Sequence, residues 1–281
     1  MTSVAATLRP YRAAFLSRFT QMLQYRSAAL AGFATQCWWG GIKAMVLAAF
    51  YRAAGPEAAG APLSFGQAVT YTWVAQALLA LLPWVGDPEV AQAVRSGAVA
   101  YDRLRPVDAY ALWYVRSGGW IAARALPRAL LMFAFAALLL PLVGLPAWRW
   151  LGPADASAAL WFACALVLAL LLATAMLMLI NVAVLATLNE RGVTVLATPI
   201  VVVFSGNLLP LGLFPDALQT ALRWQPFAGL LDIPLRLYFG QWRGVDAAAG
   251  LALQAFWVIA LIALGRALMA RSLRMLEVQG G

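Results

Sequence analysis

Apolar residues along this chain are gathered into long runs, separated by short polar stretches. A helix needs about 20 apolar residues to cross roughly 30 Å of hydrocarbon, and six runs approach or exceed that length. They predict membrane-spanning helices at residues 28–51, 64–85, 109–143, 157–188, 192–206 and 246–270.

Two of these runs are too long for one upright crossing. The 109–143 run carries Arg116, Arg124 and Arg128 within its first 20 residues, so we expect it to begin with a cytoplasmic or interfacial lead-in. The 157–188 run has no Gly or Pro that would divide it, so we expect it to project into the cytoplasm.

The stretch at residues 207–240 is apolar but cannot form a straight helix. Proline lacks a backbone N–H and its ring clashes with the preceding turn. The stretch therefore predicts a broken, partly re-entrant extracellular segment, tolerated where protein or a water-filled cavity covers the backbone. The prolines that interrupt it are Pro210, Pro215, Pro226 and Pro234.

Residues 1–27 predict an amphipathic helix ahead of the first span. Arg9 and Arg18 lie at opposite edges of its apolar stripe, from which they can reach lipid headgroups. We expect this helix to lie in the membrane surface; the alternative is a cytoplasmic helix packed on another subunit. The stripe comprises Leu8, Tyr11, Phe15, Phe19, Met22 and Leu23.

Residues 86–108 form a polar island with four acids and three arginines. Asp87 is a favourable N-cap, Pro88 suits the first helical position and Gly97 suits the position after the last turn. Glu89 and Arg95 complement the helix dipole. The island therefore predicts a short, well-capped helix.

One face of that short helix is apolar, formed by Val90, Ala93 and Val94. This ridge suits a groove on another protein. The alternative is an interfacial connector that has no partner.

Composition places the chain among polytopic membrane proteins. Hydrophobic residues make up 64% and charged residues 11%, whereas soluble domains use about 45–50% and about 25%. The net charge of +9 could indicate nucleic acid binding, but most arginines lie just outside the apolar runs, where they orient spans instead.

The distribution of positive charge predicts the orientation. Fourteen Lys and Arg residues lie in the set of segments that includes both termini and the polar island, and five lie in the opposite set. By the positive-inside rule, both termini and the island are cytoplasmic. The fourteen lie in residues 1–27, 86–128, 189–191 and 266–281.

Several function classes lack their residues. The chain has no histidine, which excludes a His-Glu-x-x-His zinc protease, and its single lysine, Lys43, lies in an apolar run, so no P-loop exists. We expect no metal site, no bound cofactor and no enzymatic activity in this chain. An ATP-independent channel or secondary transporter stays as the alternative function.

Lys43 lies on one face of the first span together with small and polar residues. Such a stripe favours a helix contact or a cavity lining over lipid. One hypothesis is that this face lines a transport pathway or meets a partner; the alternative is close packing, with Lys43 extending to the headgroups. The candidates are Gly32, Gln36, Gly40 and Lys43, with Asn207 at the start of the broken segment.

Three stretches resemble the permeases of ABC-2-type transporters, in the bacterial subgroup with two different permeases and one ATP-binding subunit. They are GDPEVAQAVRSGAVAYDRLRPVD, the run FSGNLLPLGLFPDALQTALRWQPFAGLLDIPLRLYFG at 204–240, and the terminal LEVQGG. The N-terminal YRAAFLSRFTQMLQYR is also similar to the family's leading helix. The similarity covers almost the whole chain in matching order.

The resemblance implies an all-α, six-span permease occupying 28–281 behind the helix of 1–27, in a bacterial inner membrane. Residues 86–97 would be the cytoplasmic coupling helix between the second and third spans. It would dock on an ATPase chain, present in two copies, that binds the ATP and Mg. A second permease, unlike this one, would complete the pathway, and transport would be export. The implied docking and exit residues are Asp87, Glu89, Arg95, Gly97, Asp102, Arg103 and Arg105.

Overall fold

The computed structural model describes residues 4–55, 63–102, 104 and 106–275, and every regular element in them is a helix. Short 3₁₀ or π segments join several of the α-helices. The α-helices are α1 (Val4–Leu23), α2 (Arg26–Ala54), α3 (Phe65–Ala77), α4 (Pro88–Arg95), α5 (Val99–Asp102), α6 (Ala109–Phe133), α7 (Leu140–Leu142), α8 (Ala156–Thr187), α9 (Glu190–Phe204), α10 (Asp216–Trp224), α11 (Asp232–Tyr238) and α12 (Gly244–Met275).

Three helices in the described residues are long and apolar enough to cross a membrane: Ala109–Leu142, Ala156–Thr187 and Gly244–Arg274. They correspond to the third, fourth and sixth predicted spans. α2 has the length, but Gln36 and Lys43 make its middle more polar. α9 has 15 residues, about 22 Å at 1.5 Å per residue, which is shorter than the hydrocarbon.

The predicted span at 64–85 differs most from the structure. α3 ends at Ala77 after 13 residues, a 3₁₀ turn follows at Leu79–Leu81, and Pro83 prevents the helix from continuing. Nearly all of this segment is buried inside the protein, including Trp73 and Val74. Its apolar character therefore reflects burial against other helices and not one unbroken crossing.

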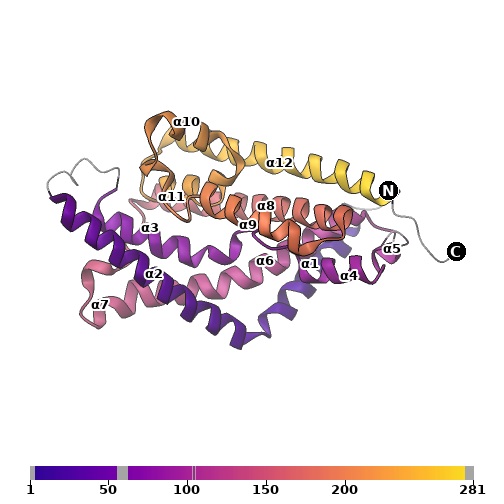
Figure 1. The fold of residues 1–281 in the computed structure, drawn as a ribbon, viewed down its shortest axis with the longest axis horizontal. Coiled ribbons are helices and arrows are strands. Elements are labelled where there is room, and N and C mark those ends of the chain that lie inside the picture. Colours follow the sequence, from indigo (N-terminus) through magenta and orange to yellow (C-terminus); the bar gives the residue numbers. More distant parts are fainter. Residues whose placement is uncertain (1–3, 56–62, 103, 105, 276–281) are drawn as a thin grey trace.

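The long helices run roughly along the longest axis of the molecule, with α8 between α6 and α12 (Figure 1). α4, α5, the beginning of α1 and the last turns of α12 lie together at one end of that axis. α7, α10 and the beginning of α8 lie toward the other end. The two ends of the bundle therefore carry different elements, and α4 lies at the end opposite α7 and α10.

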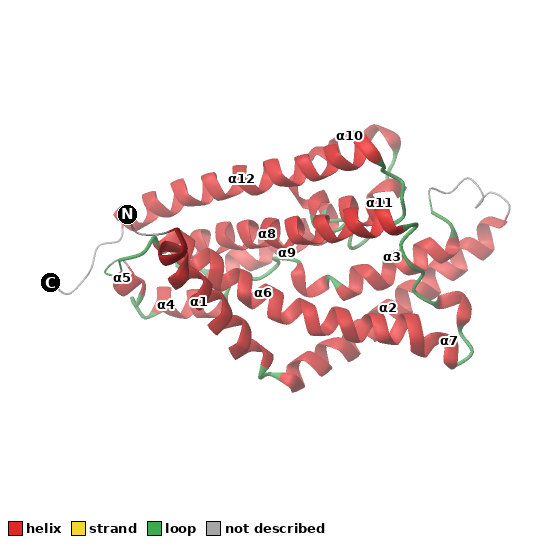
Figure 2. Ribbon diagram, turned by 180° about the vertical axis from the view of Figure 1, so that it is seen from behind, coloured by secondary structure: helices red, strands yellow, loops and turns green. Residues whose placement is uncertain are grey.

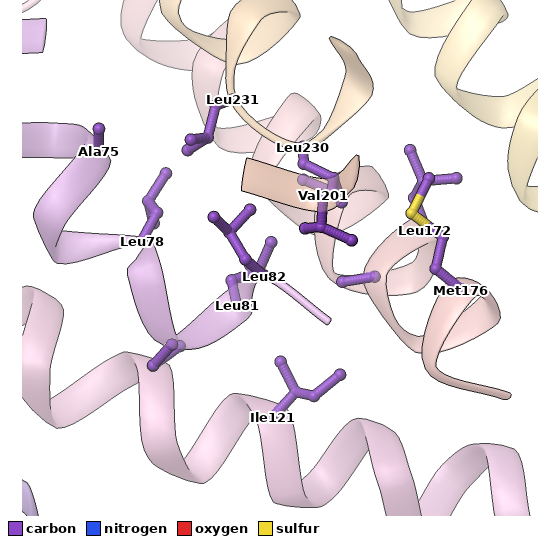
Figure 3. Close-up of a cluster of buried hydrophobic side chains, with 14 of the residues drawn as sticks. Ala75, Leu78, Leu81, Leu82, Ile121, Leu172, Met176, Val201, Leu230 and Leu231 are labelled. Carbon is purple, nitrogen blue, oxygen red and sulfur yellow. The ribbon is translucent and has the colours of Figure 1, made fainter. Parts of the chain in front are cut away.

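The largest buried cluster joins elements that are far apart in sequence (Figure 3). Leu81 and Leu82 lie beside Ile121 of α6, and Leu172 of α8 approaches Leu230. This cluster fixes the segment between α3 and α4 onto α6 and α8, and so positions α4.

α6 continues to Leu142 through a π segment at Ala134–Leu139. Pro141 lacks an N–H for the carbonyl one turn earlier, and a wider π turn accommodates the ring. The helix is therefore continuous over the predicted 109–143 span.

The segment after α9 is broken into short helices, as the prolines require. A 3₁₀ turn at Leu211–Leu213 precedes α10, and another at Pro226–Gly229 precedes α11. In α11 a buried ion pair joins Arg236 Nε to Asp232 Oδ2 at 2.6 Å. Figure 2 shows this segment against one end of the bundle.

α1 packs along α6 of the same chain, which is neither of the two arrangements expected for residues 1–27. A Cβ on Gly119 would lie 2.7 Å from the carbonyl oxygen of Phe15, so only glycine allows this approach. Tyr11 and Phe19 are half-buried, whereas Leu8 and Leu16 are exposed on the outer side. The helix ends at Leu23, and the chain turns directly into α2.

Candidate functional site

The best-defined polar site is the base of α4, which forms where the polar island predicted a helix. The Asp87 carboxylate accepts from the Glu89 N–H at 3.0 Å as an N-cap, and Pro88 occupies the first turn. Gly97, with φ of 72°, lies just after the last turn. Local sequence therefore defines both ends of this helix.

Arg18 of α1 joins this helix to the N-terminal segment. Its Nη2 lies 3.3 Å from Asp87 Oδ1, and its Nη1 donates to Glu89. Arg116 of α6 donates to the other Glu89 oxygen at 2.6 Å. Two arginines and two carboxylates thus balance in charge where three helices meet.

Neutral groups extend this cluster to α8. The Asn181 side-chain oxygen accepts from the Asp87 N–H at 3.0 Å, and Asn181 Nδ2 donates to Ser117 Oγ at 3.4 Å. Ser117 Oγ in turn donates to Asp87 Oδ2 at 3.4 Å. We call Arg18, Asp87, Glu89, Arg116, Ser117 and Asn181 the α4 base cluster.

Burial dominates the electrostatics of this cluster. It raises the pKa of Asp87 above its ordinary range, an effect that the charges of Arg18 and Arg116 and the hydrogen bond from Ser117 oppose. Burial also lowers the pKa of Arg18, again opposed by Asp87. Either charge would be unfavourable in this buried position without the other. We therefore expect that removal of one partner destabilises the site.

The apolar ridge of α4 faces the protein's own helices. Val90 is buried beside Trp113 of α6 and Met178 of α8, and Ala93 and Val94 pack on the same group. It is therefore not available as an exposed ridge for another protein. The opposite face exposes Gln92, Arg95 and Ser96, and Arg95 Nη1 forms an ion pair with Glu190 of α9 at 2.7 Å.

The residues predicted to meet a partner fall into three groups. Asp87 is 2% exposed, so its carboxylate is not accessible to another protein. Glu89 is half-buried in the cluster, while Arg95 and Gly97 are exposed. The backbone of Asp102 ends α5, and Arg103 and Arg105 lie outside the described residues.

Sequence reasoning missed the role of Arg18 and Arg116. Arg18 lies at the edge of the apolar stripe of α1, a position that also suits contact with lipid headgroups. Its partners are 69 and 71 positions away, so no local spacing reveals them. The only indication in the sequence is an excess of acidic residues near the start of the polar island.

Lys43 and Asn207, both predicted as pathway candidates, are in contact. Lys43 Nζ donates to the Asn207 backbone oxygen at 2.8 Å and to its side-chain oxygen at 3.0 Å. Among the described residues no carboxylate pairs with Lys43. The ammonium group thus ties α2 to the first residues of the broken segment.

The rest of the predicted stripe is a packing surface. A Cβ on Gly32 would lie 2.6 Å from Arg128 Cζ, and one on Gly40 would lie 2.4 Å from the ring of Trp73. Gln36 is buried, and its side-chain oxygen has no hydrogen-bond partner. Gly32 and Gly40 therefore allow α2 to approach α6 and α3 closely.

In the described part of the chain, no three His, Cys, Asp or Glu side chains are placed to hold a metal ion. The chain matches no protein-family model, and no curated protein matches it. Functional inference therefore depends on the α4 base cluster, the apolar helices and the sequence resemblance.

Proposed function

We propose that this chain is the membrane subunit of an ATP-driven ABC-2-type transporter, an exporter in a bacterial inner membrane. The observation that carries the proposal is α4, a short capped helix held at the end of an apolar bundle by the buried Arg18–Asp87 ion pair and the partly exposed ion pairs of Glu89. The resemblance of residues 86–108 to the coupling region of that family supports the same conclusion.

The α4 base cluster suits the transfer of force from α4 to the spans. Charge-assisted hydrogen bonds link α4 to α1 and α6, and the Asn181 amide links it to α8. Two of these helices, α6 and α8, are long and apolar enough to cross the membrane. A displacement of α4 would therefore move both.

In this proposal the outer face of α4 meets the ATPase. Gln92, Arg95 and Ser96 are exposed and lie opposite the face that packs on the bundle. Asp87 would act inside the protein by holding α4 in place. The energy source must be another chain, because no P-loop exists here.

The six-span arrangement also belongs to the proposal. The three long apolar helices would be joined in the membrane by α2, by α3 with the turn after it, and by α9. The charge distribution would place α4 in the cytoplasm. A second, different permease would complete the pathway beside the faces of α2 and α9 on which Val46 and Leu196 are exposed.

The test is co-purification from the native host with a tagged full-length chain in mild detergent. Partners are identified by mass spectrometry, and ATPase activity is assayed. The variant Gln92→Trp/Ser96→Trp changes only exposed positions of α4. Gly152→Trp, exposed at the other end of the bundle with no atom within 4 Å of an added Cβ, is the matched control.

We expect a P-loop ATPase with the wild type and the control, and at least a tenfold loss with the α4 variant. Loss of the co-purifying ATPase from both variants would indicate a general defect in the protein and would contradict docking at α4. Absence of any ATPase across several detergents would overturn the proposal and favour the ATP-independent channel or secondary transporter.

A further inference from the structure

Two arginines of α6 have no carboxylate partner among the described residues. Arg124 and Arg128 lie one turn apart within the apolar helix Ala109–Leu142, and both are half-buried. Neither forms an ion pair with any described residue. Like charges four residues apart repel each other on a helix, so this arrangement favours an anion between them.

The nearby carboxylates are already used. Asp87 pairs with Arg18, and Glu89 pairs with both Arg18 and Arg116. The α4 base cluster is therefore balanced in charge, and the two positive charges farther along α6 are in excess.

Both guanidinium groups retain free donors. Arg124 Cζ lies over the Trp120 ring, 4.2 Å from its centroid, and no described residue accepts a hydrogen bond from its guanidinium. Arg128 Nη2 donates to the Ala28 carbonyl oxygen at 3.3 Å, and its buried Nε lies against Gly32 of α2. The donor left for an incoming anion is therefore Nη1, from which no described residue accepts a hydrogen bond. Guanidinium edges of this kind match the geometry of phosphate oxygens.

An apolar groove continues from these arginines along the same two helices. It has a volume of about 690 Å³ and runs between α2 and the π segment that extends α6. Its wall begins at Phe33, next to Gly32, against which the Arg128 guanidinium lies. The other lining residues include Ala34, Cys37, Leu131, Phe135 and Leu139.

The geometry points to a binding site for one phospholipid, with its phosphate between Arg124 and Arg128 and an acyl chain in the groove. Arg128 lies beside Ala28 and Gly32 near the start of α2, where a polar helix end gives way to an apolar run. A headgroup phosphate belongs at that depth. This inference rests on membrane insertion and is independent of coupling to an ATPase.

The test is native mass spectrometry of the full-length chain in detergent, with three probes. Phosphatidylglycerol carries both a phosphate and acyl chains, diacylglycerol has only the chains, and inorganic phosphate has only the anion. The main variant is Arg124→Gln/Arg128→Gln. The matched control, Arg271→Gln/Arg274→Gln, removes the same charge from exposed arginines of α12.

Two further variants separate the parts of the site. Arg124→Gln alone removes no hydrogen bond among the described residues, so it tests the phosphate contact without disturbing the contact between α2 and α6. Ala34→Trp fills the exposed groove and keeps both arginines.

We expect phosphatidylglycerol retention to fall at least fivefold in the double variant, and at least twofold in Arg124→Gln and in Ala34→Trp. The α12 control should match the wild type. Equal retention in the double variant and the wild type would overturn the inference. So would equal binding of diacylglycerol, or displacement of the lipid by millimolar inorganic phosphate, which would identify a free-anion site.

Discussion

Arg18 shows how much one side chain contributes to this structure. It is the only described residue of α1 that forms an ion pair with α4, and it reaches two carboxylates. Its side chain is 7% exposed and that of Asp87 is 3% exposed. Solvent therefore screens this pair far less than it screens a surface ion pair.

Replacing Arg18 with Met should destabilise the protein by roughly 3 kcal/mol, because a buried carboxylate then loses its nearest cation. The measurement is the midpoint of unfolding in detergent, with unfolding monitored by circular dichroism. Arg12→Met, which changes an exposed position of α1, is the matched control and should have little effect.

The double variant Arg18→Met/Asp87→Asn extends this test. It removes the charge that Arg18→Met leaves buried, so it should recover part of the lost stability. A double variant no more stable than Arg18→Met would show that the ion pair is not the source of the effect.

At the scale of elements, helix ends are defined by local chemistry that can be tested by pH. Asp155 caps α8: its carboxylate accepts from the Ser157 hydroxyl at 2.6 Å and the Ala158 N–H at 2.8 Å. These hydrogen bonds, with the charge of Arg243, hold the pKa of Asp155 below its ordinary value.

The contribution of this cap should depend on pH in a defined direction. Because the folded pKa is lowered, the stabilisation is complete above the unfolded pKa of about 3.9 and is lost as pH falls through the folded value. Asp155→Asn should therefore lower the melting temperature at pH 6 and have a smaller effect near pH 3. An equal effect at both pH values would contradict this assignment.

Elements with a strong local pattern were predictable from the sequence. The predicted span at 157–188 corresponds to α8 at Ala156–Thr187, and the capping residues of the polar island gave the position of α4. Both depend on apolar run length and on helix caps. These are properties of neighbouring residues.

Features that depend on distant contacts were not predictable in this way. The 64–85 run has the length of a span, but buried neighbours accommodate a break after Ala77. The Asn181 side-chain oxygen accepts from the Asp87 N–H in the loop before α4, and this partner could not be inferred from the sequence. The α4 base cluster likewise joins four helices that only the folded chain brings together.

At the scale of the whole molecule, the two ends of the bundle differ in character. One end carries α4 with its ion pairs, and the other carries the broken segment after α9 (Figure 1). In the proposed orientation the first end is cytoplasmic and the second extracellular.

Cysteine labelling tests this orientation directly. In a background with Cys37→Ala/Cys164→Ala, Ser96→Cys should react with an impermeant maleimide only after the cells are permeabilised. Gly152→Cys should react in intact cells, because it is exposed at the opposite end. The reverse result would invert the topology, and labelling of both positions in intact cells would exclude a membrane between them.

The distance in sequence between Arg18 and its partners also has a consequence for biosynthesis. The ribosome adds Asp87 69 residues after Arg18, a delay of roughly 3 to 14 seconds at ordinary elongation rates. During that interval α1 has neither α4 nor α6 to pack against, so in the proposed membrane protein its apolar stripe would remain associated with the insertion machinery or the lipid surface. Faster or interrupted translation through residues 19–116 should therefore alter the yield of correctly inserted protein more than a similar change after α8.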